Sequence, residues 1–189
     1  SVPANMKFGA LTIKNGNNRI LGDIEVVRDL RIENGATLTI GNDISNANGV
    51  TAASLLSSNG KLPDAFNQFH KVTVGGDLTV NGTFRGASVK NVLNILNDAG
   101  VKDWHEIIVA GNVNVSGIMN FADFTTDNGE IMQSLSMNSI DRKGRLIFTG
   151  GKDSEFNILN EVKLLGFTCA KNPDVRLDVK RVAGKKFRL

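Results

Sequence analysis

The stretch FHKVTVGGDLTVNGTF at residues 69–84 recurs as WHEIIVAGNVNVSGIM at residues 104–119, 35 positions further along the chain. The two stretches align without a gap, and most columns keep the same chemical type. Two looser copies precede them, at residues 20–26 and 28–38. Repetition at fixed spacing is typical of stacked supersecondary units, none of which can bury its apolar face alone. The sequence therefore predicts a mainly β protein built from repeated strand–turn units.

Apolar residues alternate with polar or small residues inside each copy, with the period of two that a half-buried strand requires. Gly-Asp or Gly-Asn interrupts the alternation at its centre, and Asn-Gly or Ser-Gly closes it, as expected where a strand bends. A β-solenoid and a strongly bent β-meander both fit this pattern, and the like-on-like repetition favours the solenoid. We expect equivalent valines of the two copies to point into one shared core: Val74 with Val109, and Val80 with Val115.

Turn-forming residues dominate the composition. The 189 residues include 22 Asn and 20 Gly, but only 3 Pro and no Tyr, and the six Asn-Gly pairs are typical of tight reversals. With 41% hydrophobic and 22% charged residues, the chain is ordinary for a globular protein and long enough to bury a core. We expect a repeat-containing β domain over residues 1–150, and a C-terminal segment over residues 151–189 that packs on it or docks to a partner.

One or two short helices are expected between the repeated strands. Residues 88–99 begin with Ser88, a good N-cap, and are followed by Gly100, a good residue for a helix C-terminus. The apolar side chains between them form one stripe, as in an amphipathic helix. Residues 50–57 predict a shorter helix. Residues 130–140 and 154–165 fit either a helix or a strand. Residues 174–182 alternate apolar and polar side chains and predict a final strand.

No arrangement of side chains indicates a particular reaction. His70 and His105 occupy the same column of the repeat, but without a third ligand they indicate a polar ladder rather than a metal site. The acidic column of the repeat ends in an amide, which could not act as a general acid, whereas a turn-forming role suits Asp and Asn equally. Its members are Asp23, Asp29, Asp77 and Asn112. We predict no catalytic, cofactor-binding or metal-binding residue, and therefore no enzyme.

The single cysteine and the absence of long apolar stretches limit the possibilities further. Cys169 lies in an apolar stretch and is predicted to be a buried, inert thiol, and one Cys excludes an intrachain disulfide and Cys-based zinc sites. The N-terminal residues lack a signal-peptide pattern, and no stretch has enough apolar residues to span a membrane. These features predict a soluble protein made in a cytoplasm, with no membrane partner.

The basic charge gathers at the C-terminus, in a chain of formal net charge +3. Phe187 is the only aromatic residue among these cations, so specific nucleic-acid recognition is not expected. Apolar residues that alternate with cations fit an added edge strand, which either completes the chain's own sheet or contacts a partner. The residues predicted for such a partner contact are Lys185, Lys186, Phe187, Arg188 and Leu189.

The sequence VGGDLTVNGTF at residues 74–84, with its echo at residues 109–119, resembles the β-helical or β-rich structural proteins of bacteriophage virions: fibres, spikes and capsid-decorating proteins. It is also similar, more weakly, to the bactofilin-like cytoskeletal polymers, whose coils read Gly-Asp-Leu-x-Val-x-Gly. The first resemblance implies a homo-oligomer, often a trimer, that docks to other virion or scaffold proteins. It also implies a place in a virion assembled in the host cytoplasm, and it supplies no catalytic residue and no cofactor.

Three functions therefore follow from the sequence, in this order: a structural virion protein, a polymer-forming scaffold, and a glycan-binding or glycan-cleaving β-helix protein. The ends of the solenoid separate the first two, because a filament former needs both ends bare, whereas an attached protein needs a capped end or a docking tail. Aromatic residues make up only 6% of the chain, which counts against a carbohydrate platform of stacked rings.

Overall fold

The computed structural model describes Val2 and residues 5–41, 70–87, 105–121, 144–164 and 166–188. All regular elements in these ranges are strands, and no helix long and apolar enough to cross a bilayer is found there. Sheet 1 contains β1 (Met6–Phe8), β4 (Ile24–Val26), β7 (Lys71–Val74), β10 (His105–Val109), β13 (Gly144–Phe148) and β16 (Gly166–Cys169). Sheet 2 contains β2 (Leu11–Ile13), β5 (Leu30–Ile32), β8 (Leu78–Val80), β11 (Val113–Val115), β14 (Ser154–Ile158) and β17 (Leu177–Arg181). Sheet 3 contains β3 (Gly16–Ile20), β6 (Ala36–Ile40), β9 (Thr83–Gly86), β12 (Ile118–Asn120), β15 (Glu161–Lys163) and β18 (Phe187–Arg188).

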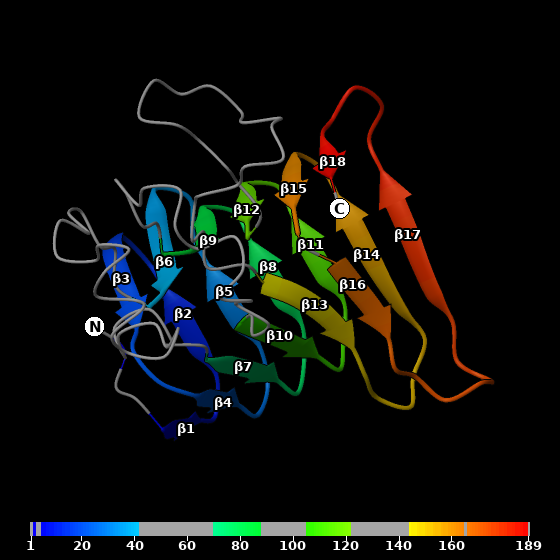
Figure 1. Cartoon of the computed structure of the whole chain (residues 1–189), viewed down its shortest axis with the longest axis horizontal. Coiled ribbons are helices and arrows are strands. Elements are labelled where there is room, and N and C mark those ends of the chain that lie inside the picture. Colours follow the sequence, from blue (N-terminus) through cyan, green and yellow to red (C-terminus); the bar gives the residue numbers. More distant parts are fainter. Residues whose placement is uncertain are drawn as a thin grey trace, which may run out of the picture.

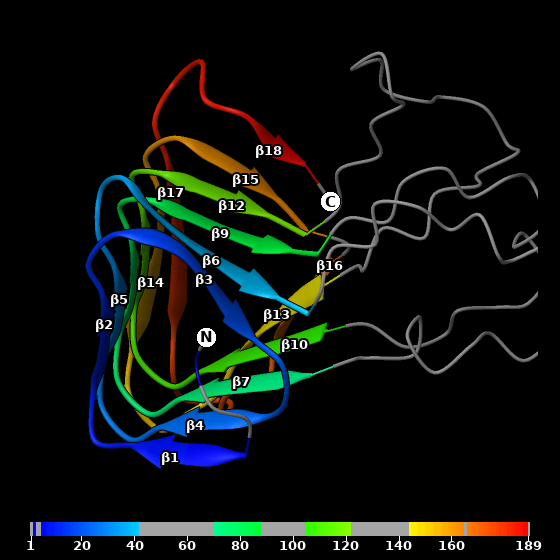
Figure 2. The ribbon, with the colours of Figure 1, turned by 90° about the vertical axis from the view of Figure 1, so that its left-hand side faces the viewer.

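Three consecutive strands, one from each sheet, make one coil, and the coils stack from coil 1 (β1–β3) to coil 6 (β16–β18). Figure 1 shows the coils side by side, and Figure 2 shows the three sheets as the three sides of the stack. Every strand pairs in parallel with the equivalent strand of the next coil. This arrangement is that of a β-solenoid. Antiparallel pairs, which a bent meander requires, do not occur among the described strands, so the prediction of a mainly β protein of repeated units is confirmed.

The 35-residue repeat in the sequence corresponds to two neighbouring coils. Strand β10 pairs with β7 so that Ile107 lies opposite Val72, and β11 pairs with β8 so that Val113 lies opposite Leu78. The two looser copies, at residues 20–26 and 28–38, are not two units. Apart from Ile20, which ends β3, and residues 21–23, which connect coils 1 and 2, they form parts of the single coil 2. The error arose because Gly-Asp and Arg-Asp turns at two corners of one coil look alike in sequence.

Columns of apolar side chains fill the interior of the solenoid. Val74, Val109, Val80 and Val115 are all buried and belong to the same core cluster, which confirms the shared core. Phenylalanines are among these side chains, and in coil 5 the rings of the buried Phe148 and Phe156 lie 5.5 Å apart. Because each rung adds its side chains to the same columns, no coil except an end coil exposes its inner face.

Two of the three corners are short turns that Asn, Asp and Gly make possible. Asn-Gly pairs turn the chain from sheet 2 to sheet 3, and Gly35 there has a φ of +79°, a conformation that favours glycine. Asp29, Asp77 and Asn112 stand at the corner between sheets 1 and 2. Asp23 does not belong to this column, because it precedes sheet 1 and its Oδ1 accepts a hydrogen bond from the backbone N–H of Lys71 instead.

The third corner, from sheet 3 to sheet 1 of the next coil, is where long segments join the coils. Figure 2 shows β6, β9 and β12 ending, and β7, β10 and β13 beginning, at this one corner. The helices predicted at residues 88–99 and 50–57, and the ambiguous residues 130–140, lie outside the described residues. The other ambiguous segment, residues 154–165, contributes strands β14 and β15. Residues 174–182 contain β17, which is not the final strand, because β18 follows it. Residue 150, where the sequence predicts that the repeat-containing domain ends, lies between β13 and β14 of the same coil.

Candidate functional site

The outer face of sheet 2 carries polar side chains in two columns that run along the solenoid. The register between strands places one residue from each coil in each column. In the first column, which begins at the corner between sheets 1 and 2, are Asp29, Asp77, Asn112, Glu155 and Asp178. The second column contains Thr12, Arg31, Thr79, Asn114, Asn157 and Lys180.

The first column joins coils through hydrogen bonds from backbone to side chain. Asp29 Oδ1 accepts from the N–H of Asp77 at 2.9 Å, and Asp77 Oδ1 accepts from the N–H of Asn112 at 2.7 Å. Asn112 Oδ1 in turn accepts from the N–H of Glu155 at 2.9 Å. Each bond crosses from one coil to the next rather than closing a turn within one coil. These side chains therefore cap backbone donors at a corner where the strand ladder is interrupted.

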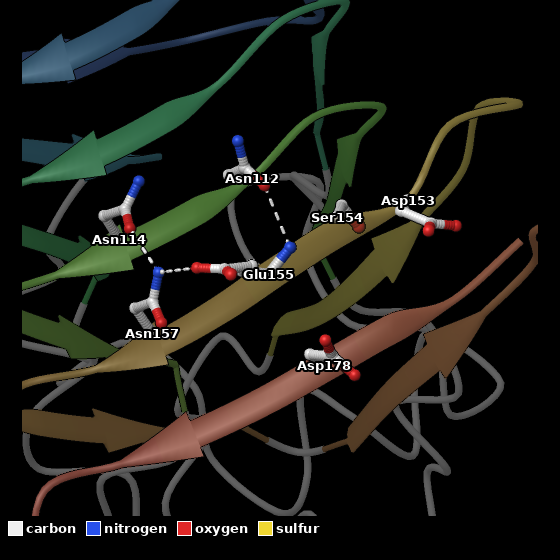
Figure 3. Close-up of a pocket in the computed structure, with 7 residues that line it drawn as sticks. All are labelled: Asn112, Asn114, Asp153, Ser154, Glu155, Asn157 and Asp178. Carbon is white, nitrogen blue, oxygen red and sulfur yellow. Dashed lines mark hydrogen bonds between the residues drawn. The ribbon is translucent and has the colours of Figure 1, made fainter.

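The two columns border an open groove of about 360 Å³ near the C-terminal end of the sheet (Figure 3). Asn157 Nδ2 donates to Asn114 Oδ1 at 2.8 Å and to Glu155 Oε2 at 3.0 Å. Carboxylates of Glu155 and Asp178 lie on adjacent strands across the groove. Amide groups and carboxylates at this spacing can hydrogen-bond a hydroxyl-rich ligand. The groove is lined by Asn112, Asn114, Asp153, Ser154, Glu155, Asn157 and Asp178.

An ion pair between Glu155 and Lys180 lies at the edge of the groove. The hydrogen bond from Lys180 is the main reason that the pKa of Glu155 lies below its ordinary value, and the bond from Asn157 lowers it further. The same pair raises the pKa of Lys180. The pairing of the two groups therefore favours the charged form of each.

The two histidines stack on neighbouring coils, as their shared column predicts. Their ring centroids lie 6.0 Å apart with an interplanar angle of 23°. The backbone N–H of His70 donates to Nδ1 of the buried His105 at 3.1 Å, so His105 is part of the contact between coils. Within the described ranges, no group of three or more His, Cys, Asp or Glu residues is placed to hold a metal ion.

The predicted partner-contact residues lie in coil 6. Strand β18 pairs in parallel with β15, with Phe187 opposite Val162, so this segment extends the chain's own sheet. The Phe187 ring packs 5.8 Å from the ring of Phe156. Lys185 and Lys186 are exposed, and contact with a partner through these lysines stays a prediction. Leu189 lies outside the described residues.

The prediction of a buried thiol is wrong, because Cys169 is exposed. It lies opposite the buried Phe148, in a column that is apolar in coils 1 to 5. Among the described residues no seventh coil covers coil 6, so the same column position that buries Phe148 leaves Cys169 open. Position in the stack, and not the local sequence, decides its exposure.

Sequence reasoning missed the groove because five of its seven residues, between Asp153 and Asp178, come from segments that lack the visible repeat. The alternation of Ser154, Phe156 and Ile158 was the available signal for β14, and it implied that Glu155 and Asn157 face outward. Comparison with protein-family models, with curated proteins and with solved structures found no match to this chain.

Proposed function

We propose that this chain is a non-enzymatic structural and assembly protein, in which the β-solenoid is a stiff support for segments that join it at one corner. The observation that carries the proposal is the unequal length of the connections at the corner between sheet 3 and sheet 1. Three of the five connections are long, namely residues 42–69, 88–104 and 122–143.

The solenoid itself does not require long connections at this corner. Between coils 1 and 2 the same corner is crossed by Leu21, Gly22 and Asp23 alone, and between coils 5 and 6 only residues 164–165 separate β15 from β16. Three residues are thus enough to carry the chain from one rung to the next. In repeat proteins, insertions into successive repeats emerge on one face, which is often the binding face. The long segments therefore serve contacts with other molecules rather than the fold.

Most of the polar side chains that could have suggested an enzyme hold the coils together. Asp77 and Asn112 cap backbone donors, and Glu106 is held by Arg145 across neighbouring strands of sheet 1. A structural role of this kind accounts for the placement of these side chains without catalysis. The resemblance to β-helical virion proteins suggests the setting: a fibre, spike or capsid-decorating component of a phage that forms homo-oligomers, often trimers, and docks to the particle.

Excision of one segment tests this proposal. We expect a chain in which Leu-Gly-Asp, the connection at residues 21–23, replaces residues 88–104 to keep the far-ultraviolet circular dichroism and the thermal midpoint of the parent. Light scattering should show that the parent is an oligomer and that the excised chain has a lower molar mass. A third chain, with residues 88–104 scrambled at unchanged length, separates the content of the segment from its length. A monomeric parent, or an excised chain that assembles like the parent, would contradict the proposal.

Glycan binding is a second candidate, favoured by the groove on sheet 2. Its amide and carboxylate groups suit sugar hydroxyls, although no aromatic ring lines it. Asn114→Ala, which removes an outward amide, is expected to weaken binding of a glycan probe without unfolding the chain. Thr12→Ala, in the same column at the other end of the sheet, is the matched control. Equal binding by the two variants would remove this candidate.

A further inference from the structure

An apolar column in sheet 2 ends in a charged residue. Its members in coils 1 to 5 are all buried, but in coil 6 the register places Arg181 opposite Ile158. A further coil stacked on β17 would bury the guanidinium group, which is costly unless a partner supplies an opposite charge. Inward-pointing charges are one of the ways in which edge strands are protected from unwanted pairing. The five apolar members are Ile13, Ile32, Val80, Val115 and Ile158.

The open side of coil 6 combines such cations with exposed apolar surface. Val179 is 45% exposed, although its counterpart Phe156 in coil 5 is fully buried. Val182 is equally exposed, and Phe187 is only partly buried. Apolar surface surrounded by polar groups is the usual composition of a protein interface. Four exposed cations of this coil have no ion-pair partner among the described residues: Arg176, Arg181, Lys185 and Lys186.

The other end of the solenoid carries charge of the same sign. Coil 1 contains Lys14 and Arg19, together with Lys7, which pairs with Glu25 of coil 2, and no acidic residue occurs between Asn5 and Gly22. Coil 6 contains seven cations and only two acidic residues, Asp174 and Asp178. Any contact between the ends of two copies, whether coil 6 meets coil 1 or coil 6 meets coil 6, therefore brings cations together. This repulsion opposes a filament of stacked copies.

We infer that the open side of coil 6 is a docking face for an extended, acidic segment of a partner protein, which adds a strand to β17. The inference deepens the assembly role proposed above and rests on it. The edge of β17 pairs only with β14 among the described strands, so its other side offers backbone groups to a new strand. Carboxylates opposite Lys180 and Arg181 would neutralise the charges, and apolar residues opposite Val179 would cover the exposed surface.

A labelled peptide tests the docking face directly. We expect a fluorescein-labelled peptide, Thr-Val-Thr-Val-Glu-Glu-Glu-Thr, to bind the full chain in a fluorescence anisotropy titration at low salt. Replacing its three Glu by Gln, or its second Val by Pro, should abolish measurable binding, because the first change removes the charge and the second prevents strand pairing. The variant Lys185→Glu/Lys186→Glu should bind the peptide on the order of tenfold more weakly, since two exposed charge contacts become repulsive. Arg181→Glu should act in the same direction.

Controls separate the docking face from general charge effects. Lys7→Glu/Lys14→Glu makes the same change in net charge at two exposed positions of coil 1, away from coil 6, and should leave peptide binding unchanged. A short DNA duplex should bind more weakly than the peptide. Sedimentation velocity should show that the protein does not form linear polymers whose length increases with its concentration. Equal loss in both charge variants, equal binding of the Gln peptide, tighter binding of the duplex, or linear self-association would each overturn the inference. Loss of oligomers on excision of residues 88–104 is a separate measurement, so failure here is distinguishable from failure of the assembly role.

Discussion

Asp77 accepts a hydrogen bond through Oδ1 from the backbone N–H of Asn112, one coil further along, at a distance of 2.7 Å. Asn112 repeats the arrangement by accepting from Glu155. The column therefore needs an acceptor oxygen at this position and does not need a negative charge. We expect Asp77→Asn to change the free energy of unfolding by less than about 1 kcal/mol, because the amide oxygen replaces the carboxylate oxygen. Urea denaturation measures the difference.

The matched variant Asp77→Ala removes the acceptor and leaves the N–H of Asn112 without it. We expect this substitution to lower the free energy of unfolding by about 1 kcal/mol, the low end of the cost of an unsatisfied donor, because this donor is only partly buried. If Asn and Ala at this position were equally destabilising, the charge and not the acceptor would be what the column requires. Loss of an activity on any glycan in Asp77→Asn would revive the enzyme interpretation.

Val80 tests the shared core. It is fully buried and lies between Ile32 and Val115 in one inward column. Val80→Asp would place a carboxylate among apolar side chains, and removing the valine alone forfeits roughly 1.5–3 kcal/mol of burial. We expect the thermal midpoint to fall sharply or the chain not to fold. Thr79→Asp, on the outward side of the same strand, should have little effect, and an unchanged melting curve for Val80→Asp would contradict the core assignment.

The strands and the way they stack were predictable where two neighbouring coils have the same spacing. Alternating valines gave the strands of coils 3 and 4, and like-on-like repetition gave their parallel stacking. Coil 5 was not visible as a repeat, because the spacing is 39 residues from Ile107 to Leu146 but 43 from Val113 to Phe156. A longer turn at residues 149–153 and two additional residues at the start of β14, Ser154 and Glu155, together cause this difference. Self-comparison at one fixed offset cannot detect a coil whose corners differ in length.

The candidate site was harder to predict than the fold, since it depends on which strands become neighbours. Asn114 and Asn157 are far apart in the sequence and meet only because β11 and β14 pair. The basic C-terminal residues were recognised as an alternating strand, but the sequence left open whether that strand belongs to its own sheet. What the local sequence could not indicate is that Arg181 ends an apolar column, because the column exists only once six coils are stacked.

Glu106 makes stability depend on pH. Its pKa lies below the ordinary value of 4.5, mainly because of the hydrogen bond from Arg145, with further lowering by the positive charges of Arg145 and Lys71. A lowered pKa in the folded state means that the carboxylate stabilises the fold fully above pH 4.5 and that this contribution is lost as the pH falls through the lowered value. We expect the thermal midpoint of the parent to fall in this acidic range.

Glu106→Gln removes the titrating group but keeps a side chain of the same shape. The variant should be less stable than the parent at neutral pH, and the difference between the two should shrink as the pH falls below 4.5. Thermal melts of both chains between neutral and acidic pH measure this difference. A constant difference over the whole range would mean that the ion pair with Arg145 contributes nothing to stability.

Gly117 lies at the corner between sheets 2 and 3, in close contact with the preceding coil. A Cβ added to Gly117 would overlap the backbone carbonyl oxygens of Gly82 and Asn81 in the preceding coil. Because backbone atoms cannot move aside like the end of a flexible side chain, Gly117→Ala should lower the free energy of unfolding by about 1–3 kcal/mol, as overpacking usually does. Gly151→Ala is the matched control, since a Cβ there meets no atom within 4 Å. Urea denaturation of both variants decides the matter: equal stability would mean that the coils are not packed this closely at the corner.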